Sequence, residues 1–469
     1  MNVQSYMDSG FDPMPADMVT QRQQAPLNLA PVGAKTVTLD FDGGRLSSDA
    51  GVVLLKDIDA QLGLTRNLAA VLSDPRDPRR INFTLEDLLK QRVFQIAAGY
   101  EDANDANTLR ADPIFKLLLD RLPETGSSLA SQPTLSRFEN RVSRPELYRM
   151  ALELLHQFIA SYTSAPKVIV LDVDDTEDPV HGGQEHARYD SYYGGYCFMP
   201  LHVYEGLSGR LITTILKAKR FTGAQMLAVL KRLVKRLRQV WPHTLLIVRG
   251  DSHFAYPEVM QWIEAQPSMG YVTGLTSNVV LQALAREVVE QATRAYALSG
   301  HKVTRFHSTR YQAGTWSRPR RVVIKVEVSE QGINTRFVVT DLEQARTKVL
   351  YQKIYCARGQ AENEIKDHKL YLKSDRTSCH RFEANQLRVL LHSAAYVLLE
   401  TLRREVLKTT QWASATMETI QLRLLKVGAR VQECEDRITI SCPSSCPVAP
   451  ILRHSLTLLA CVRLTAESL

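Results

Sequence analysis

The sequence predicts a mixed α/β fold, in which a core that contains a sheet is interrupted by an all-β insertion and preceded by a mostly helical domain. Three observations predict it. Residues 84–160 carry apolar side chains at helical spacing, residues from 167 onward alternate between strand-type and helix-type patterns, and residues 301–340 form short alternating segments. The 469 residues are enough for about two to four domains, or for one large core with insertions.

The N-terminal part reads as a lead-in followed by helices. Residues 1–34 are polar, rich in Pro and aperiodic, so we expect a flexible N-terminus there. TVTLDFDGG at 36–44 alternates like a strand and ends in a Gly turn. Ser47-Ser48-Asp49 then precedes the apolar helical pattern GVVLLKDIDAQLGL. The segments LEDLLKQRVFQIAAGY, PIFKLLLDRL and PELYRMALELLHQFIASY complete a helical domain with expected bounds 35–165.

One stretch of this domain has two interpretations. QPTLSRFENRV at 132–142 fits the turn and second helix of a DNA-reading pair, with Ser136, Arg137, Asn140 and Arg141 exposed. An ordinary bundle helix is the alternative, and the pattern favours it.

A strand-rich core begins at residue 167, and its first part is expected to span 166–278. KVIVLDVD is a run of β-branched residues, and YCFMPLHVYE (196–205) and RLITTILKAK (210–219) form a predicted hairpin around Gly206–Gly209. A helix capped by Thr222 follows, TGAQMLAVLKRLVKRLRQV. TLLIVRGD is a buried-type strand that ends in Asp251, and YPEVMQWIEAQ and YVTGL add a helix and a strand.

The second half of the chain completes the core after the insertion. We expect the insertion at 279–345, with a helix at 279–297 and then HKVTRF, RYQAGTW, RRVVIKVEV and TRFVVT as strands. The second part of the core, 346–408, holds a polar helix, YCARGQAENEIKDHK, and a long apolar one, ANQLRVLLHSAAYVLLETLRREVL. The C-terminal region, 409–469, contains a helix around 415–427, the strand RITISC and a final helical segment after Pro450.

Composition narrows the class of protein. The net charge of +8 and the pI near 9.0 favour a polyanionic partner, although charge alone is a weak signal. Seven scattered cysteines do not resemble a disulfide framework, and Cys442 and Cys446 match no usual zinc spacing, so a reducing cytosol fits. A secretory signal and an apolar run of about 18 residues are both missing from the sequence, and we expect no membrane segment.

Four carboxylates point to metal-assisted phosphoryl chemistry. That chemistry needs hard cations held by carboxylates on rigid elements. Asp172 and Asp174 share one face of the first core strand by period-2 alternation, Asp251 ends another strand, and Glu362 lies on the polar helix. Strand ends that face a helix-borne Glu are the ribonuclease H-like arrangement, and the order of elements from 167 to 275 matches that fold.

The polar helix carries one stripe of functional groups. At 3.6 residues per turn, its members fall along a single face, namely Tyr355, Arg358, Glu362, Lys366 and Lys369. Such a face could hold a metal-bound phosphate, because the acid ligates the cation while the bases neutralise phosphate oxygens. The alternative is a solvated helix with intrahelical ion pairs.

The order Tyr, Arg, Glu, Lys along this helix resembles the Y-R-E-K signature of bacterial DDE insertion-sequence transposases, nearest the group numbered thirteen-eighty. VLDVDDTEDPVHGGQE and RGDSHF are similar to the first and second acidic motifs of that group, and the resemblance spans roughly residues 35–440. It implies that Asp174, two residues before Thr176, is the first catalytic acid, with Asp172 as its rival. Asp251 and Glu362 match the second and third acids.

The resemblance also implies the activity, cofactors and partners. The enzyme is expected to cut DNA at the ends of its element and to transfer the strand to target DNA, through attack by water and then by a 3′ hydroxyl. Two Mg²⁺ ions are expected on Asp174, Asp251 and Glu362, and Mn²⁺ can substitute. Tyr355, Arg358 and Lys369 match the positions that contact the terminal phosphates and the transferred end.

The expected partners are double-stranded DNA at terminal inverted repeats, target DNA and a second copy in a dimer. A hairpin intermediate and a bacterial cytoplasmic, nucleoid-associated location are implied too.

A cluster in the insertion is a further DNA-binding candidate. RYQAGTWSRPRR interleaves aromatic and basic residues, a mix that suits flipped or single-stranded bases, and relatives use a Trp of this insertion to expose a flipped base. The predicted DNA-binding residues are Trp316, Arg318, Arg320 and Arg321, together with Lys366 of the polar helix. The alternative is a β hairpin with a packed Trp.

Competing functions stay open at this point. D-x-D-x-T at Asp172, Asp174 and Thr176 also begins haloacid-dehalogenase-like phosphatases, although Ala255 stands where that family expects an acid and the predicted hairpin does not suit its parallel sheet. A ribonuclease H-like nuclease that cuts without joining, and a protein that only binds DNA, are further alternatives. His253 is a candidate to assist Asp251, or a hydrogen-bonded structural residue.

Overall fold

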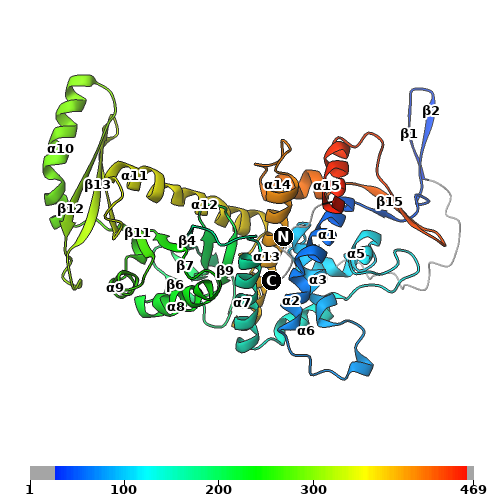
Figure 1. Ribbon diagram of the computed structural model, residues 1–469. Coiled ribbons are helices and arrows are strands. Elements are labelled where there is room, and N and C mark those ends of the chain that lie inside the picture. The colour runs from blue at the N-terminus through cyan, green and yellow to red at the C-terminus, as the bar shows by residue number, and fades with distance from the viewer. Residues whose placement is uncertain (1–26, 462–469) are drawn as a thin grey trace, which may run out of the picture.

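The computed structural model describes residues 27–461, and its centre is an eight-stranded mixed sheet beside a helical region (Figure 1). The sheet order is β12-β13-β14-β11-β10-β4-β8-β9. In chain order its strands are β4 (Val168–Asp175), β8 (Leu201–Glu205), β9 (Leu211–Ile215), β10 (Leu245–Gly250), β11 (Met269–Leu275), β12 (Val303–Tyr311), β13 (Arg320–Ser329) and β14 (Gly332–Thr340).

Five of these strands form the predicted ribonuclease H-like core. The first three, β4, β8 and β9, are joined by antiparallel pairing, and the fourth and fifth, β10 and β11, are parallel to β4. Counted along the chain, their order in the sheet is third, second, first, fourth, fifth. The first strand therefore lies in the middle, where its ends are fixed by neighbours on both sides.

The insertion extends this sheet rather than forming a separate body. β14 pairs antiparallel with β11, and β13 and β12 follow at the outer edge. Its helix, α10 (Val279–Ser299), packs along β12 and β13. Three long strands replace the several short ones that the sequence predicts, because HKVTRF and the start of RYQAGTW belong to the single strand β12.

Helices cover both faces of the sheet. α8 (Gly223–Val240) and α9 (Pro257–Glu264) lie beneath it in Figure 1, where their apolar sides share a core with Ile169, Leu171 and Val173 of β4. The opposite face carries Val170 and is covered by Leu350 and Tyr351. These two residues begin a long helix, residues 347–371, which we call the signature helix.

The signature helix is continuous but irregular. It runs through α11 (Thr347–Val349), a π-helical stretch (Leu350–Tyr355), a 3₁₀ turn (Cys356–Arg358), α12 (Gly359–Lys366) and a second π-helical stretch (Asp367–Tyr371). The predicted single stripe of side chains requires a uniform 3.6-residue period, so the irregular helix keeps it only in part. π-helical turns change which side chains share a face and are common at functional sites.

The helical region lies on the other side of a central helix, α13 (Phe382–Thr401), which is buried on nearly all sides and has apolar residues around its whole circumference (Figure 1). α13 packs against α3 on one side and β9 on the other, so it joins the two halves of the molecule. The remaining helices of the region are α1 (Val53–Leu62), α2 (Leu64–Ala70), α3 (Leu85–Ala97), α4 (Ala106–Leu109), α5 (Pro113–Leu118), α6 (Gln132–Asn140) and α7 (Arg144–Ala160), with α14 (Met417–Ile420) and α15 (Ala449–Cys461) from the C-terminal part.

Three small sheets differ from the sequence predictions. The predicted strand 196–205 is two strands, β7 (Gly195–Phe198) and β8, because Pro200 lies between them and lacks the N–H that a ladder needs. β7 pairs instead with β5 (Asp178–Pro179) and β6 (Arg188–Asp190).

At the N-terminal end, β1 (Leu27–Val32) pairs with β2 (Lys35–Leu39) within the predicted lead-in, whose residues 1–26 lie outside the described part. β15 (Ala429–Glu433) has no predicted counterpart and joins β3 (Leu46–Ser47) to β16 (Ile438–Ser441).

Two findings concern the cysteines and the helices. Each cysteine is a free thiol. Among residues 27–461, no helix is both long and apolar enough to cross a bilayer.

Candidate active site

The two aspartates of β4 lie in different environments although they share one face of the strand. Asp172 is buried and paired with Arg249 of β10, whose Nε and Nη2 lie 2.5 Å from its two carboxylate oxygens. Arg249 also donates to the carbonyl oxygen of Ile354, in the signature helix. Both oxygens of Asp172 therefore take part in a buried ion pair with Arg249, and the side chain is only 1% exposed.

Asp174 stands at the open end of the same strand. Its Oδ2 accepts a hydrogen bond from Nη1 of Arg358 at 2.8 Å, and its Oδ1 accepts one from the backbone N–H of Asp175 at 3.0 Å. Burial raises the pKa of Asp174 to about 7, with a further upward push from the charge of Asp251, while Arg358 acts in the opposite direction. A carboxyl group held near neutrality by burial and a second acid is typical of functional sites.

Asp251 is placed beside Asp174 by the parallel register of β4 and β10. Gly250 is the partner of Val173, so the next residue along each strand brings these two acids to the same edge of the sheet. The carboxylate of Asp251 accepts hydrogen bonds from the N–H and Nδ1 of His253, at 2.8 and 2.9 Å. Nε2 of His253 lies 2.8 Å from Nη1 of Arg220. Because a guanidinium only donates, Nε2 accepts and Nδ1 carries the hydrogen that Asp251 receives.

Glu362 reaches the same place from the signature helix. Its side chain is 60% exposed, and its Oε1 accepts a hydrogen bond from Nη2 of Arg358 at 2.7 Å. One guanidinium group therefore bridges Asp174 and Glu362, across a separation of 184 residues between Asp174 and Arg358. The structure thus joins two of the predicted acids through Arg358, and Asp251 lies near enough for its charge to act on Asp174 and Arg358.

The arrangement is not a closed metal site as it stands. In the described part of the chain, no three His, Cys, Asp or Glu side chains lie close enough together to hold a metal ion. Arg358 lies between two of the acids and supplies the positive charge that they share. The donor set of three carboxylates nevertheless suits a hard divalent cation.

The other supporting residues divide between two sides of the signature helix. The hydroxyl of Tyr355 lies beside Gly274 and the backbone of Asp251, where a side chain on Gly274 would come within 2.8 Å of it. Nζ of Lys369 lies 3.3 Å from the Thr176 hydroxyl and donates to the carbonyl oxygen of Glu177. Lys366 instead lines a separate pocket on the far side of the helix.

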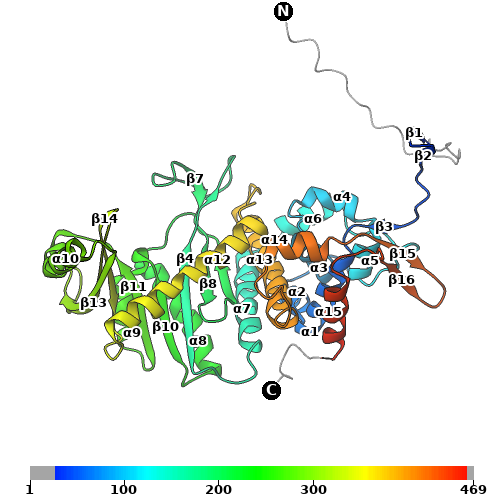
Figure 2. The same ribbon diagram turned by 90° about the horizontal axis from the view of Figure 1, so that it is seen from above.

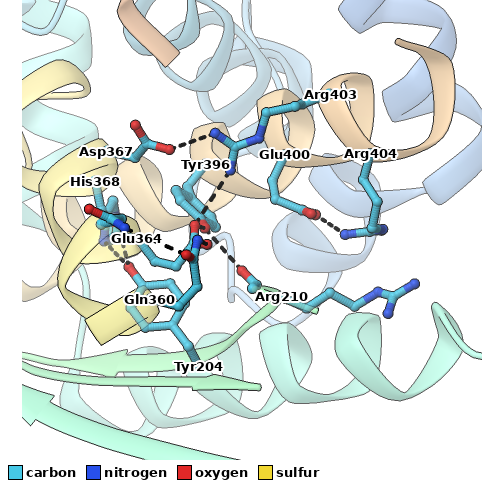
Figure 3. Close-up of polar contacts among 12 residues, drawn as sticks. Tyr204, Arg210, Gln360, Glu364, Asp367, His368, Tyr396, Glu400, Arg403 and Arg404 are labelled. Carbon is cyan, nitrogen blue, oxygen red and sulfur yellow. Dashed lines mark hydrogen bonds and ion pairs between the residues drawn. The ribbon is translucent and has the colours of Figure 1, made fainter. Parts of the chain in front are cut away.

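That far side holds a buried polar network that sequence reasoning missed (Figure 3). Glu364 accepts hydrogen bonds from the hydroxyl of Tyr396 and from Nε2 of Gln360, the second at 2.8 Å, and lies 3.4 Å from Nη2 of Arg403. Arg403 also pairs with Asp367 at 2.7 Å. The available signal was the presence of polar residues, Tyr396 and Arg403 among them, in a helical run rich in apolar residues.

The predicted DNA-binding cluster of the insertion is packed into the fold. Trp316 is 6% exposed and makes an edge-to-face contact with Tyr311 at 5.4 Å. Arg320 lies 5.0 Å from the Trp316 ring and, with Arg318, pairs with Glu264.

Arg321 is also buried, and it donates to the carbonyl oxygens of Leu342 and Glu343. Of the four residues only Arg318 is well exposed, at 58% of its side chain. These contacts are those of the alternative, a β hairpin with a packed Trp. The burial of the Trp316 ring argues against its stacking on a DNA base.

The predicted DNA-reading segment behaves as a bundle helix. Glu139 of α6 is buried between Arg92 and Arg388, each 2.9 Å from one of its carboxylate oxygens. Of its proposed contact residues, Arg137 is exposed, while Ser136, Asn140 and Arg141 are half-buried.

The phosphatase alternative does not fit the geometry. β8 and β9 form an antiparallel hairpin directly beside β4, whereas that fold needs parallel strands joined by helices. Asp172, its nucleophile, is held on both oxygens by Arg249.

Comparisons with known proteins identify a family. A family model described as transposase DDE domain group 1 matches residues 29–464. No curated protein matches the chain. Among solved structures, the chain is similar to piggyBac transposase in a cryo-EM synaptic complex with hairpin DNA, with 13% identity, a TM-score of 0.41, and coverage of 81% of this chain and 80% of that one.

Proposed function

The chain belongs to the transposase DDE domain group 1 family, which it matches over residues 29–464, and from that premise we propose that Asp174, Asp251 and Glu362 are its catalytic acids. The proposal is that the enzyme cuts DNA at the ends of its element and joins the freed 3′ hydroxyl to target DNA. The observation that supports it is the bridge that Arg358 makes between Asp174 and Glu362, with Asp251 close enough for its charge to act on Asp174, whose pKa is raised to about 7.

Divalent cations, Mg²⁺ in the proposal with Mn²⁺ as a substitute, would be held by these three carboxylates. The raised pKa supports this, because a carboxyl group pushed toward neutrality by burial and by a second acid is stabilised in its charged form by a bound cation. Two such ions would polarise the attacking oxygen and stabilise the leaving one.

The remaining side chains position the DNA. Arg358 now neutralises two acids. Once bound cations neutralise those acids instead, its guanidinium can turn to a phosphate. Lys369 lies at the end of the first motif, beside Thr176, where a second phosphate contact fits. The enzyme would act by holding the scissile phosphate in line with its attacker, without a covalent intermediate.

The DNA partners belong to the same proposal. They are double-stranded DNA at terminal inverted repeats and a target duplex, and the net charge of +8 supports a polyanionic partner. A dimer that bridges two ends, a hairpin intermediate and action at the nucleoid in the bacterial cytoplasm complete it.

An assay of cleavage and joining on candidate element ends with Mg²⁺ tests the proposal. Asp174→Asn, Asp251→Asn and Glu362→Gln should each lower both steps by at least about 10³-fold, because each removes charge that stabilises the transition state. Glu330→Gln, at an exposed turn of the insertion, is the matched control and should act like wild type.

Two outcomes contradict the proposal in different ways. Unchanged activity in the three variants would make the acids incidental. Cleavage without joining in the wild-type protein would identify a nuclease.

A further inference from the structure

A hairpin beside the candidate active site presents tyrosines to solvent. β6 and β7 and the turn between them, residues 188–198, read RYDSYYGGYCF, and we call this segment the tyrosine hairpin. Its four tyrosines are exposed, Tyr189 by 61%, Tyr192 by 80%, Tyr193 by 36% and Tyr196 by 60%. Figure 2 shows the region of β7 standing out from the sheet.

The hairpin is a built structure. Asp190 holds its turn, because its carboxylate accepts the N–H of Tyr192 and its carbonyl accepts the N–H of Gly194, both at 2.9 Å. Gly194 has φ of +70°, a conformation that favours glycine. The tyrosines pair edge to face, Tyr189 with Tyr196 at 5.8 Å and Tyr192 with Tyr193 at 4.9 Å.

This surface is unusual in its exposure. Single apolar side chains on a surface need no explanation, but a contiguous exposed patch marks a binding site. The contrast with Trp316 is direct, since that aromatic residue is 6% exposed and already packed. The tyrosine rings are the ones that a ligand can reach.

Arg220 links the hairpin to the catalytic acids. Its guanidinium lies 5.8 Å from the Tyr192 ring, and its Nη1 lies 2.8 Å from Nε2 of His253. His253 in turn donates to Asp251 at 2.9 Å. The chain after Asp174 also reaches the tyrosine hairpin, because β5 follows Asp174 by a few residues and pairs with β7. A DNA strand bound at Asp174 and Asp251 therefore passes close to the tyrosines.

We propose that the tyrosine hairpin stacks unpaired bases of the DNA strand next to the scissile phosphate, while Arg220 neutralises a neighbouring phosphate. Aromatic faces accept any base, and guanidinium groups hold the backbone between them. A second copy of the chain is a less suitable occupant, because the Arg220 guanidinium lies at the Tyr192 ring and Arg188 belongs to the hairpin itself, so positive charge that favours a polyanion accompanies the rings. The inference rests on the proposed function, since it places DNA at the three acids.

The experiment measures binding of the full-length protein to a single-stranded oligonucleotide of about 12 nucleotides and to the same sequence as a duplex, without divalent metal. A 2-aminopurine base in the oligonucleotide reports stacking through its fluorescence. The test variant is Tyr189→Ala with Tyr192→Ala. Tyr192→Phe keeps an aromatic ring, and Tyr148→Ala is the matched control, since Tyr148 is 49% exposed on α7.

We expect the double variant to bind the single strand about 5- to 100-fold more weakly and to lose 2-aminopurine quenching. Duplex affinity, the Phe variant and the control should match wild type. Equal affinities in all variants would overturn the inference. A change in oligomeric state by light scattering with unchanged oligonucleotide affinity would also overturn it, and would assign the rings to a contact between protein copies.

The result is separable from that of the cleavage assay. Stacking that depends on the tyrosines in a protein that does not cut would support the hairpin and contradict the transposase activity. Cleavage that is lost with Asp174→Asn but insensitive to the tyrosines, with unchanged single-strand binding, would do the reverse.

Discussion

The two faces of the signature helix carry acids two residues apart in opposite circumstances. Glu362, on the face toward β4 and β10, is 60% exposed and paired with Arg358. Glu364, on the face toward α13, is buried and held by Tyr396, Gln360 and Arg403 (Figure 3). The two faces therefore have different roles: the face with Glu364 fixes the helix in place, and the face with Glu362 leaves its carboxylate accessible.

The network around Glu364 also explains why residue 209, in the β8–β9 turn, is a glycine. The hydroxyl of Tyr396 lies 3.0 Å from the carbonyl oxygen of Gly209, in the β8–β9 turn. A Cβ atom on Gly209 would lie 2.6 Å from Oε1 of Glu364, and its φ is +74°. Only glycine lets this turn approach the helix so closely. The network thus ties the signature helix to the sheet and to α13 together.

The strongest test of this comparison is a matched pair of substitutions. Glu364→Ala leaves the buried Tyr396 hydroxyl and the half-buried Arg403 with fewer partners and opens a cavity, so we expect the free energy of unfolding to fall by about 2–4 kcal/mol. Glu362→Ala makes the same chemical change on the exposed face and should change it by no more than about 0.5 kcal/mol. Denaturant unfolding of both variants measures the difference, and similar losses would refute the different roles of the two faces.

The free energy of unfolding should depend on pH through Asp174, because the pKa of this carboxyl group is about 7 in the folded protein and 3.8 in the unfolded chain. The folded state binds this proton more tightly, so the contribution to stability is fully present below pH 3.8 and is lost as pH rises through about 7. Without metal, Asp174→Asn should remove this loss and be more stable than wild type above pH 7, by about 2–4 kcal/mol.

Unfolding measured on both sides of this pH range, with a chelator present, gives the two curves. Parallel curves for the wild type and Asp174→Asn would show that the carboxyl group is not perturbed. Bound divalent cation should reverse the trend, because it competes with the proton for the same oxygens.

Sequence patterns predict the positions of the candidate catalytic acids better than those of the buried residues around Glu364, and the reason is physical. Alternation along a strand places Asp172 and Asp174 on one side, and parallel strand ends bring Asp251 to the same edge, so local rules suffice. The choice between the two aspartates depends on Arg249, whose pairing with Asp172 is set by the register of two strands that are distant in sequence.

Other features depend on contacts that no local pattern encodes. The network around Glu364 needs residues from the signature helix, α13 and the β8–β9 turn. The aromatic and basic residues around Trp316 fit stacking or packing equally in sequence, and only the neighbouring Glu264 and Tyr311 decide for packing. The break at Pro200 was readable, since proline interrupts a ladder, and the uniform strand prediction for 196–205 was wrong.

The central claim is that Asp174, Asp251 and Glu362 bind the catalytic cations directly, and exchanging a carboxylate for a thiolate tests it. Each acid is replaced by Cys in turn, with Asp172→Cys for comparison, and end cleavage is measured with Mg²⁺ and with Mn²⁺. A thiolate is a poor ligand for Mg²⁺ and a better one for Mn²⁺. The account predicts that Mn²⁺ restores cleavage in the three Cys variants and not in Asp172→Cys. Restoration in Asp172→Cys, or in none of the three, would contradict it.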